Sequence, residues 1–240
     1  MKLTIIGSGN IYSKYNSASY LIDGKILVDI PNGTCKALKK TNIDINQIED
    51  VLITHFHGDH FFDMPFFILE KMKRNSGDIN IYCDSIGKKQ INALMKMAFP
   101  NKQEKNCNYI NDMKFEINKY SIKKVILEHE EGISNHGYIF YQENRNIGFT
   151  GDTTLCENVK KMAKECDYLI CDCNSLIGNN HHMGIDNIKE LALNYPSCIF
   201  CTTHMDDLTR DELEKINIKN IKILNDYNEL LIWFFIRQYW

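Results

Sequence analysis

This sequence contains few prolines, no low-complexity stretch and no internal repeat. Its four prolines, at positions 31, 65, 100 and 196, are scattered, and no Pro/Gly/Ser-rich linker divides the chain. Its 240 residues are a length that one large α/β domain can fill. We therefore expect a single domain over residues 1–240.

Long apolar segments are missing as well. The N-terminal residues MKLTIIGSGN carry one lysine and only a short apolar run before Gly7, which is shorter than the core of a secretory signal. The longest late apolar run, Leu230–Ile236, falls far below the length of a membrane span. We expect no membrane partner and a cytoplasmic location.

Charge of one sign is only slightly in excess. Lys and Arg total 28 against 31 Asp and Glu, a net charge of −3, so no strong non-specific attraction to nucleic acid is predicted. The nine cysteines, an odd number at irregular spacings, favour a reduced chain over a disulfide framework. Cys171 and Cys173 lie in an apolar stretch, and we expect buried side chains there rather than a redox or metal pair.

Short β-rich runs alternate with helical patterns along the chain. Early meander-like strands followed by strand–helix alternation predict an α/β fold, in which two mixed β-sheets pack together with helices outside. The expected strands are 3–6, 19–22, 25–29, 51–54, 79–83, 114–120, 123–127, 138–141, 147–150, 168–171, 199–202 and 221–223. The expected helices are 33–40, 62–75, 85–97, 157–166, 186–194 and 209–216.

The sharpest motif is T-H-F-H-G-D-H at positions 54–60. His55 and His57 are two residues apart, so on an extended backbone both rings point the same way, as binding to one metal ion requires. Asp59 and His60 would then face a neighbouring position as the chain turns into a helix, and Gly58 would allow the tight path between the two pairs. The motif predicts a metal site, with a solvated polar loop as the alternative.

Further metal ligands must come from elsewhere in the chain. Four segments share one design, an apolar strand that ends in a donor, and the carboxyl ends of strands are where functional groups gather in α/β sheets. These segments are Val51–His55, Val125–His129, Ile147–Asp152 and Ile199–His204. Together they predict a site for two cations.

With these motifs the chain resembles the metallo-β-lactamase superfamily, and in particular its branch of ribonuclease Z and the cyclic phosphodiesterases. The resemblance covers nearly the whole chain and implies a four-layer αβ/βα sandwich. The matching elements are T-H-F-H-G-D-H at 54–60, His129 followed by Gly137-Tyr138, F-T-G-D-T at 149–153, T-T-H at 202–204, the opening G-S-G-N, and L-V-D at 27–29.

The resemblance also implies a ligand set for two divalent cations. One cation would be bound by His55, His57 and His129. The other would be bound by Asp59, His60 and His204. Asp152 would bridge the two cations, and a water or hydroxide would complete the bridge. Zinc is the expected ion, with manganese and iron as alternatives for these nitrogen and oxygen donors.

The third histidine ligand has two candidates. Relatives place it about six residues before the Gly-Tyr pair, whereas His129 lies eight before Gly137 and His136 lies directly before it. We favour His129, because a two-residue loop insertion is easier to accommodate than a ligand moved almost onto the following strand.

A second group of residues concerns proton transfer. By similarity to the phosphodiesterase branch, His182, which precedes the expected helix 186–194, is the candidate general acid, and an imidazole suits that role near neutral pH. Neighbouring His181 is expected to face solvent. Asp172 would either orient His182 or make a structural hydrogen bond, and Asp29 has the same two interpretations. Asp59 is also a candidate acceptor of the proton from the attacking water.

The predicted function is a metal-dependent hydrolase that uses a hydroxide bridging two metals. We favour a phosphodiesterase acting on RNA 3′ ends or on small or cyclic phosphodiesters. The alternative is a lactonase or thioesterase, because the same metal core performs that chemistry. A non-catalytic binding protein that kept the fold is a third hypothesis, which the complete set of ligand positions disfavours.

The expected substrate is thus a small-molecule or nucleic-acid phosphodiester. Ribonuclease Z usually carries an extended Gly/Pro-rich arm that grips tRNA, and the segment between Asp63 and Tyr120 shows no such arm. This departure puts tRNA as the substrate in doubt. The sequence leaves a homodimer open and does not decide the oligomeric state.

Overall fold

The computed structural model describes residues 1–143 and 145–232. Part of the apolar run Leu230–Ile236, from position 233 on, lies outside the described residues, as does the end of the expected domain. Within the described residues, no helix combines the length and the apolar character that crossing a membrane requires.

The strands form two mixed seven-stranded sheets. The first runs in the order β14-β1-β2-β3-β4-β5-β6 and the second in the order β13-β12-β11-β10-β9-β8-β7. The first sheet consists of β1 (Lys2–Gly7), β2 (Ser19–Ile22), β3 (Ile26–Val28), β4 (Asp50–Leu52), β5 (Ile79–Tyr82), β6 (Cys107–Ile110) and β14 (Glu229–Leu231). The second consists of β7 (Lys114–Ile117), β8 (Tyr120–Ile126), β9 (His136–Gln142), β10 (Arg145–Phe149), β11 (Tyr168–Asp172), β12 (Ile199–Thr203) and β13 (Ile221–Ile223).

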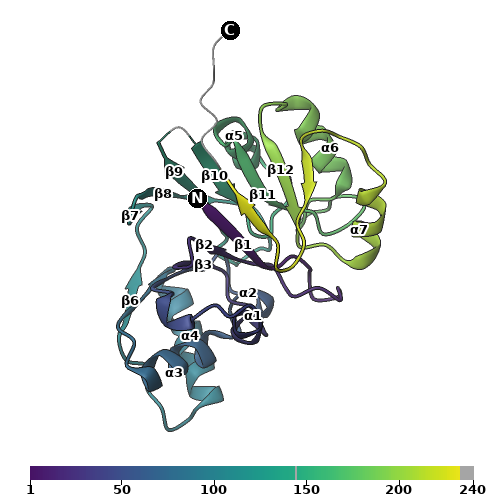
Figure 1. Ribbon diagram of the computed structural model, residues 1–240. Helices are drawn as coiled ribbons and strands as arrows, with labels where there is room; N and C mark the ends of the chain where they lie inside the picture. Colours follow the sequence, from purple (N-terminus) through teal and green to yellow (C-terminus); the bar gives the residue numbers. More distant parts are fainter. Residues whose placement is uncertain (144, 233–240) are drawn as a thin grey trace.

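Helices cover the outer face of each sheet (Figure 1). Helices α1 to α4 pack on the first sheet, and α5 to α7 pack on the second. Their bounds are α1 (Thr34–Lys40), α2 (Gly58–Phe61), α3 (Met64–Arg74), α4 (Ser85–Ala98), α5 (Glu157–Glu165), α6 (Ile185–Asn194) and α7 (Asp207–Glu214), with a short 3₁₀ helix at Ile45–Gln47.

Alternation along the strands builds three apolar cores. Because successive side chains of a strand point to opposite faces, Tyr20 and Ile22 pack between the two sheets, whereas Leu21 packs against the helices of the first sheet. In the second sheet Phe140 faces the other sheet and Ile139 faces the outer helices. The layers are therefore helix, sheet, sheet, helix, which confirms the expected αβ/βα sandwich.

Most predicted elements are present, with differences at short or edge strands. Strand β6 was not predicted, nor was β14, which pairs antiparallel with β1 at the edge of the first sheet. The predicted strands 114–120 and 123–127 form one hairpin, but its turn lies at Asn118 and Lys119, several residues earlier than expected. Asn118 has a φ of 53°, a left-handed conformation that asparagine tolerates well.

The cysteines agree with the expectation of a reduced chain. All nine are free thiols, and all but Cys107 are buried. Cys171 and Cys173, both fully buried, pack in the core between β11 and the outer helices.

Candidate metal centre

The strand-end donors meet at one edge of the two facing sheets. His55 follows β4, His129 follows β8, Asp152 follows β10 and His204 follows β12. The single turn of α2 adds the neighbouring donors Asp59 and His60. The seven side chains predicted as ligands thus come from loops and one helical turn that converge at these strand ends, as expected for an α/β protein.

Two glycines make the close approach of these loops possible. Gly151, just before Asp152, has a φ of +62°, and a Cβ there would lie 2.7 Å from Cβ of Thr54. Gly58 was expected to allow a tight turn, but its φ is not positive. Its missing side chain instead leaves room for the ring of Phe62, which a Cβ would approach to 2.6 Å.

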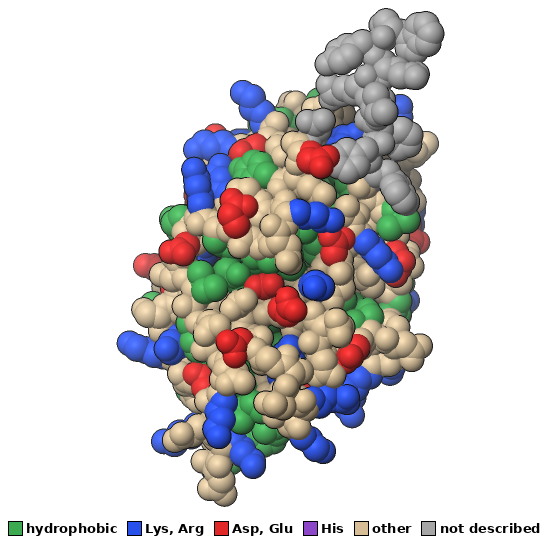
Figure 2. Space-filling model, turned by 60° about the vertical axis from the view of Figure 1, so that its left-hand side comes forward, with side chains coloured by type: hydrophobic (Ala, Val, Ile, Leu, Met, Phe, Trp, Pro, Cys, Tyr) green, Lys and Arg blue, Asp and Glu red, His purple; other side chains and the backbone are tan. Residues whose placement is uncertain are grey.

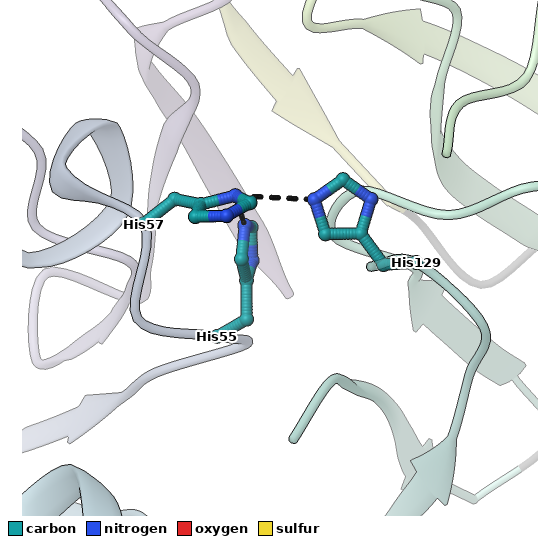
Figure 3. Close-up of side chains that lie close together, drawn as sticks. All are labelled: His55, His57 and His129. Carbon is teal, nitrogen blue, oxygen red and sulfur yellow. Dashed lines mark hydrogen bonds between the residues drawn. The ribbon is translucent and has the colours of Figure 1, made fainter. Parts of the chain in front are cut away.

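Three histidines point toward one another on one side of the site (Figure 3). His57 Nδ1 lies 3.0 Å from His55 Nε2 and 3.1 Å from His129 Nε2. Burial lowers the pKa of His55 well below its ordinary value and also lowers the pKa of His129. Both rings are therefore neutral, and each can offer one nitrogen lone pair.

A hydrogen bond to Thr54 determines which ring nitrogen of His55 carries the proton. The Thr54 hydroxyl donates to Asp29 Oδ2 at 2.7 Å, and the Thr54 backbone N–H donates to Asp29 Oδ1 at 2.8 Å. Thr54 Oγ1 is then free to accept from His55 Nδ1, which lies 3.2 Å away. This assignment directs the lone pair of His55 Nε2 into the site.

The other two rings are fixed in the same way. His129 Nδ1 lies 2.7 Å from the carbonyl oxygen of His181, so this nitrogen donates and Nε2 faces the site. His57 Nε2 lies 3.1 Å from Glu130 Oε2, so Nδ1 faces the site. Three lone pairs consequently converge within hydrogen-bond distance with no proton between them, an arrangement that a bound cation would stabilise.

A second group of donors surrounds Asp152. Its Oδ2 atom lies 3.3 Å from Nε2 of His60, 3.3 Å from Nε2 of His204 and 3.8 Å from Nε2 of His55. Asp59 Oδ2 lies 3.4 Å from His204 Nε2. Asp152 thus contacts histidines of both predicted ligand sets.

Buried carboxylates contact the two histidines of this second group at Nδ1, the ring nitrogen that faces away from Asp152. His60 Nδ1 donates to Asp29 Oδ2 at 2.8 Å, and His204 Nδ1 lies 3.5 Å from Asp172 Oδ1. His60 Nε2 and Asp152 Oδ1 are buried and have no hydrogen-bond partner within the described residues. Since buried polar atoms are nearly always paired, these two atoms indicate that the site accommodates another charged group.

Two of these residues have an unusual backbone. Asp29 has a φ of 58° and His204 a φ of 57°, in the left-handed region that side chains other than glycine rarely adopt. The His204 backbone N–H donates to the Ser8 carbonyl oxygen at 2.9 Å, which holds this conformation. Such strain gathers at functional sites, where the surrounding structure offsets its cost.

The electrostatics of the site favour positive charge. Burial disfavours the charged imidazole of His204, but the nearby carboxylates, Asp152 first, outweigh burial and raise the pKa of His204 to about 10. Burial also opposes ionisation of Asp152, yet His204 and His60 hold the pKa of its carboxyl well below the ordinary value. Divalent cations would meet the same demand for positive charge.

Four overlapping groups of donors therefore fit metal ions. The ligand atoms within each group all lie within 4.8 Å of one another. The groups are His55, His57 and His129; His55, His60 and Asp152; Asp59, His60 and His204; and Asp152, Asp172, His182 and His204. Neutral imidazoles and buried carboxylates are the donors that zinc prefers in hydrolytic sites.

The two candidates for the third histidine lie in different surroundings. His129 lies in the cluster, whereas His136 begins β9 and its backbone N–H donates to the Thr54 carbonyl oxygen at 2.9 Å. Burial and the neighbouring Lys124 lower the pKa of His136 to about 4. Among the donor groups of the described chain, His136 takes no part.

The two histidines before α6 differ in exposure, as expected. His181 is exposed, whereas His182 Nδ1 lies 2.9 Å from Asp172 Oδ2 and 3.9 Å from Asp152 Oδ2. Burial alone would lower the pKa of His182, but the bond to Asp172 raises it above the ordinary value. Asp172 and Asp29 both contact histidines of the site, the geometry that an orienting role requires.

Sequence reasoning missed Glu130 and Asn174. Glu130 contacts His57, and Asn174 Nδ2 lies 3.2 Å from His204 Nδ1. Glu130 directly follows His129, and Asn174 directly follows Cys173, but no spacing rule identifies either residue.

A sizeable cleft lies away from the donor cluster. A cleft of about 710 Å³ between α1 and α3 is lined by residues including Lys36, Phe66 and Lys73, and by none of the predicted ligands. The donor cluster therefore rests on its own chemistry and not on cavity size.

Comparison with known proteins places this fold in one class. The sequence is 33% identical over 120 residues to a ribonuclease Z of Prochlorococcus marinus (strain MIT 9215), a match that covers 47% of this chain and 38% of the relative. It is 26% identical over 196 residues to a UPF0173 metal-dependent hydrolase of Staphylococcus aureus (strain JH9), covering 78% and 77% of the two chains. The structure matches a diphosphatase of the PhnP family with a TM-score of 0.79, 18% identity and coverage of 97% and 98%.

The fold and the named relatives are those of the metal-dependent hydrolases with the metallo-β-lactamase fold. Within that class, residues 1–225 match the family described as "Anti-Pycsar protein Apyc1". The chain belongs to this family. The match to ribonuclease Z spans well under half of that relative's length, so it supports the class and leaves the substrate to be proposed.

Proposed function

We propose that this protein is a metal-dependent phosphodiesterase that hydrolyses a small or cyclic phosphodiester with two divalent cations, expected to be zinc. The observation that carries the proposal is the convergence of histidine lone pairs and buried carboxylates on Asp152, with His182 beside them. His55, His57 and His129 would hold one cation. Asp59, His60 and His204 would hold the other, with Asp152 contacting both.

The cations would supply one kind of chemistry. When bound, two such ions lower the pKa of a shared water and neutralise the charge that develops on phosphoryl oxygens. The protein contributes the fixed geometry, because Asp29, Asp172 and the carbonyl of His181 hold the rings before substrate arrives.

Two residues would move protons. His182 donates through Nδ1 to Asp172, which leaves Nε2 as the ring nitrogen that delivers a proton to the leaving oxygen. Asp59 would accept the proton of the attacking water. Its carboxylate lies 3.4 Å from His204, within the donor cluster, and is more exposed to solvent than that of Asp152.

The substrate is proposed to be small rather than a tRNA. Between Asp63 and Tyr120 the structure has α3, β5, α4, β6 and β7, a segment that is described throughout and contains only two glycines, Gly77 and Gly87. On the face drawn in Figure 2, Lys and Arg side chains are interspersed with Asp and Glu. With a net charge of −3, tight binding of tRNA with a steep salt dependence is not expected, and its observation would restore RNA 3′ ends as the substrate.

Hydrolysis of a carboxyl compound is the alternative function. The purified, zinc-loaded protein should be given a bis-aryl phosphate, a nucleoside cyclic phosphate, a homoserine lactone and an acyl thioester. We expect turnover of the two phosphodiesters alone. Turnover of only the lactone or the thioester would replace the phosphodiesterase proposal, and normal function after Asp152→Ala would support a non-catalytic role.

We further propose that residues 1–240 form one hydrolase domain, because loops from both sheets supply the donor cluster. The cytoplasmic location expected from the short apolar runs stays a prediction. So does the choice between a monomer and a homodimer, which light scattering of the purified protein would decide.

A further inference from the structure

We propose that Glu130 is a positioning residue that fixes the tautomer and the orientation of His57 and thereby holds one of the two cations. This inference rests on the proposed function, because it takes His57 to be a metal ligand. Glu130 Oε2 lies 3.1 Å from His57 Nε2, and the opposite ring nitrogen, Nδ1, faces His55 and His129. The carboxylate therefore contacts the ring from the side away from the metal position.

The need for such a residue follows from exposure. The side chain of His57 is 32% exposed, whereas those of His55, His60 and His204 are between 0% and 5% exposed. Packing holds the buried rings in place. The partly exposed ring of His57 can rotate so that Nε2 instead of Nδ1 faces the site. An acceptor at Nε2 selects the tautomer with its lone pair on Nδ1, and its negative charge makes that lone pair a better donor to a cation.

Glu130 is itself held in place by the loop that carries it. Its backbone carbonyl accepts from the Ile133 N–H at 3.1 Å, which forms a turn. The preceding residue, His129, is bonded in both directions to His181: its Nδ1 lies 2.7 Å from the His181 carbonyl, and its own carbonyl lies 3.3 Å from His181 Nδ1. The carboxylate is therefore presented from an anchored segment, although its side chain is 54% exposed.

The chain offers a matched control in the next residue. Glu131 is also an exposed glutamate of the same loop, and it makes no hydrogen bond or ion pair within the described residues. Removing either carboxylate changes the net charge near the site equally. Any difference between the two variants thus reports the contact with His57 and not the loss of a nearby negative charge.

The test compares Glu130→Ala, Glu130→Gln and Glu131→Ala with the natural protein. Zinc affinity and stoichiometry are measured by competition with a chromophoric chelator, and the His57 tautomer is read from its ¹⁵N chemical shifts in metal-free protein. We expect Glu130→Ala to weaken one of the two zinc sites by about 10–100-fold, the usual effect of losing such an outer partner, and to leave the other site unchanged. In metal-free Glu130→Ala, His57 should become a mixture of tautomers.

The conservative variant and the control complete the design. Glu130→Gln keeps an oxygen acceptor without the charge, so it should keep the His57 tautomer and lose less affinity than Glu130→Ala. Glu131→Ala should match the natural protein in both measurements. Equal zinc affinities for the two alanine variants, or an unchanged His57 tautomer in Glu130→Ala, would overturn the inference.

The failure of the proposed function would look different. If the natural protein bound zinc but hydrolysed no phosphodiester, the proposed substrate would be wrong while the role of Glu130 could stand. If it bound no metal at all, the ligand set would be wrong, and the ¹⁵N measurement would still decide whether Glu130 fixes the ring.

Discussion

The two sides of the candidate metal centre are built differently. Around His60 and His204 the orienting carboxylates are Asp29 and Asp172, whose side chains are 2% and 0% exposed. Around His57 the orienting carboxylate is Glu130, whose side chain is 54% exposed. The buried side is part of the core and is fixed by folding, whereas the open side is held by a surface loop.

This difference separates two kinds of mutational effect. A change on the buried side should remove metal and also disturb packing, because it leaves buried charges without partners. A change on the open side should alter metal binding or catalysis and leave the fold intact. Three substitutions test this contrast in order of decreasing effect on hydrolysis of a bis-aryl phosphate, and metal removal tests it through stability.

The largest effect is expected from Asp152→Ala. Because Asp152 contacts histidines of both ligand sets, its loss should abolish binding of both cations and lower kcat by about 10³-fold or more, beyond the usual loss for a single electrostatic contact. Metal content by mass spectrometry and steady-state kinetics check this. Asp112→Ala, which removes an exposed carboxylate, is the control, and two metals per chain in Asp152→Ala would contradict the bridging role.

His57→Ala tests the open side. We expect loss of one cation and a decrease in kcat of roughly 10²–10³-fold, since one of the two positive centres is gone. The thermal unfolding midpoint in the presence of a chelator should stay close to that of the natural protein, because His57 is partly exposed. Retention of both metals would show that His57 is not a ligand.

His182→Ala should have a smaller effect on this activated substrate. Loss of a general acid typically costs about 10²–10⁴-fold, and the low end is expected for an aryl leaving group that needs little protonation. The variant should still bind two metals. The decrease should grow for an alkyl leaving group, and His181→Ala, which changes the exposed neighbour, should be almost silent. Identical losses in the two variants would remove His182 from the mechanism.

Metal removal should affect stability moderately. A ligand that binds only the folded state at 100 times its Kd stabilises that state by about 2.7 kcal/mol, so zinc should raise the free energy of unfolding by this order. Calorimetry with and without zinc measures the shift. Asp152→Ala should show no zinc-dependent shift, and the opposite outcome would place the metal elsewhere in the molecule.

Local spacing explains why part of the site could be predicted from the sequence. His55, His57, Asp59 and His60 lie within one short segment, so the backbone alone brings them together. The strand-end positions of Asp152 and His204 follow from a general property of α/β sheets. The family resemblance supplied the grouping of these donors into two sets, which spacing alone does not determine.

Other features depend on contacts between distant segments. Glu130 reaches His57 across 73 positions of the chain, and no pattern marks it among the neighbouring glutamates. The sequence favours His129 over His136 as a ligand, and only the structure shows that His136 begins β9. Likewise, β6 and β14 are short edge strands of four and three residues, which form through pairing with β5 and β1 and carry little signal of their own.

The most direct test of the central claim is a crystal structure of the zinc-soaked protein with anomalous diffraction recorded on both sides of the zinc absorption edge. We predict two zinc peaks, one among His55, His57 and His129 and one among Asp59, His60 and His204, both in contact with Asp152. A map with no zinc peak in this cluster, or with a single peak that does not touch Asp152, would contradict it.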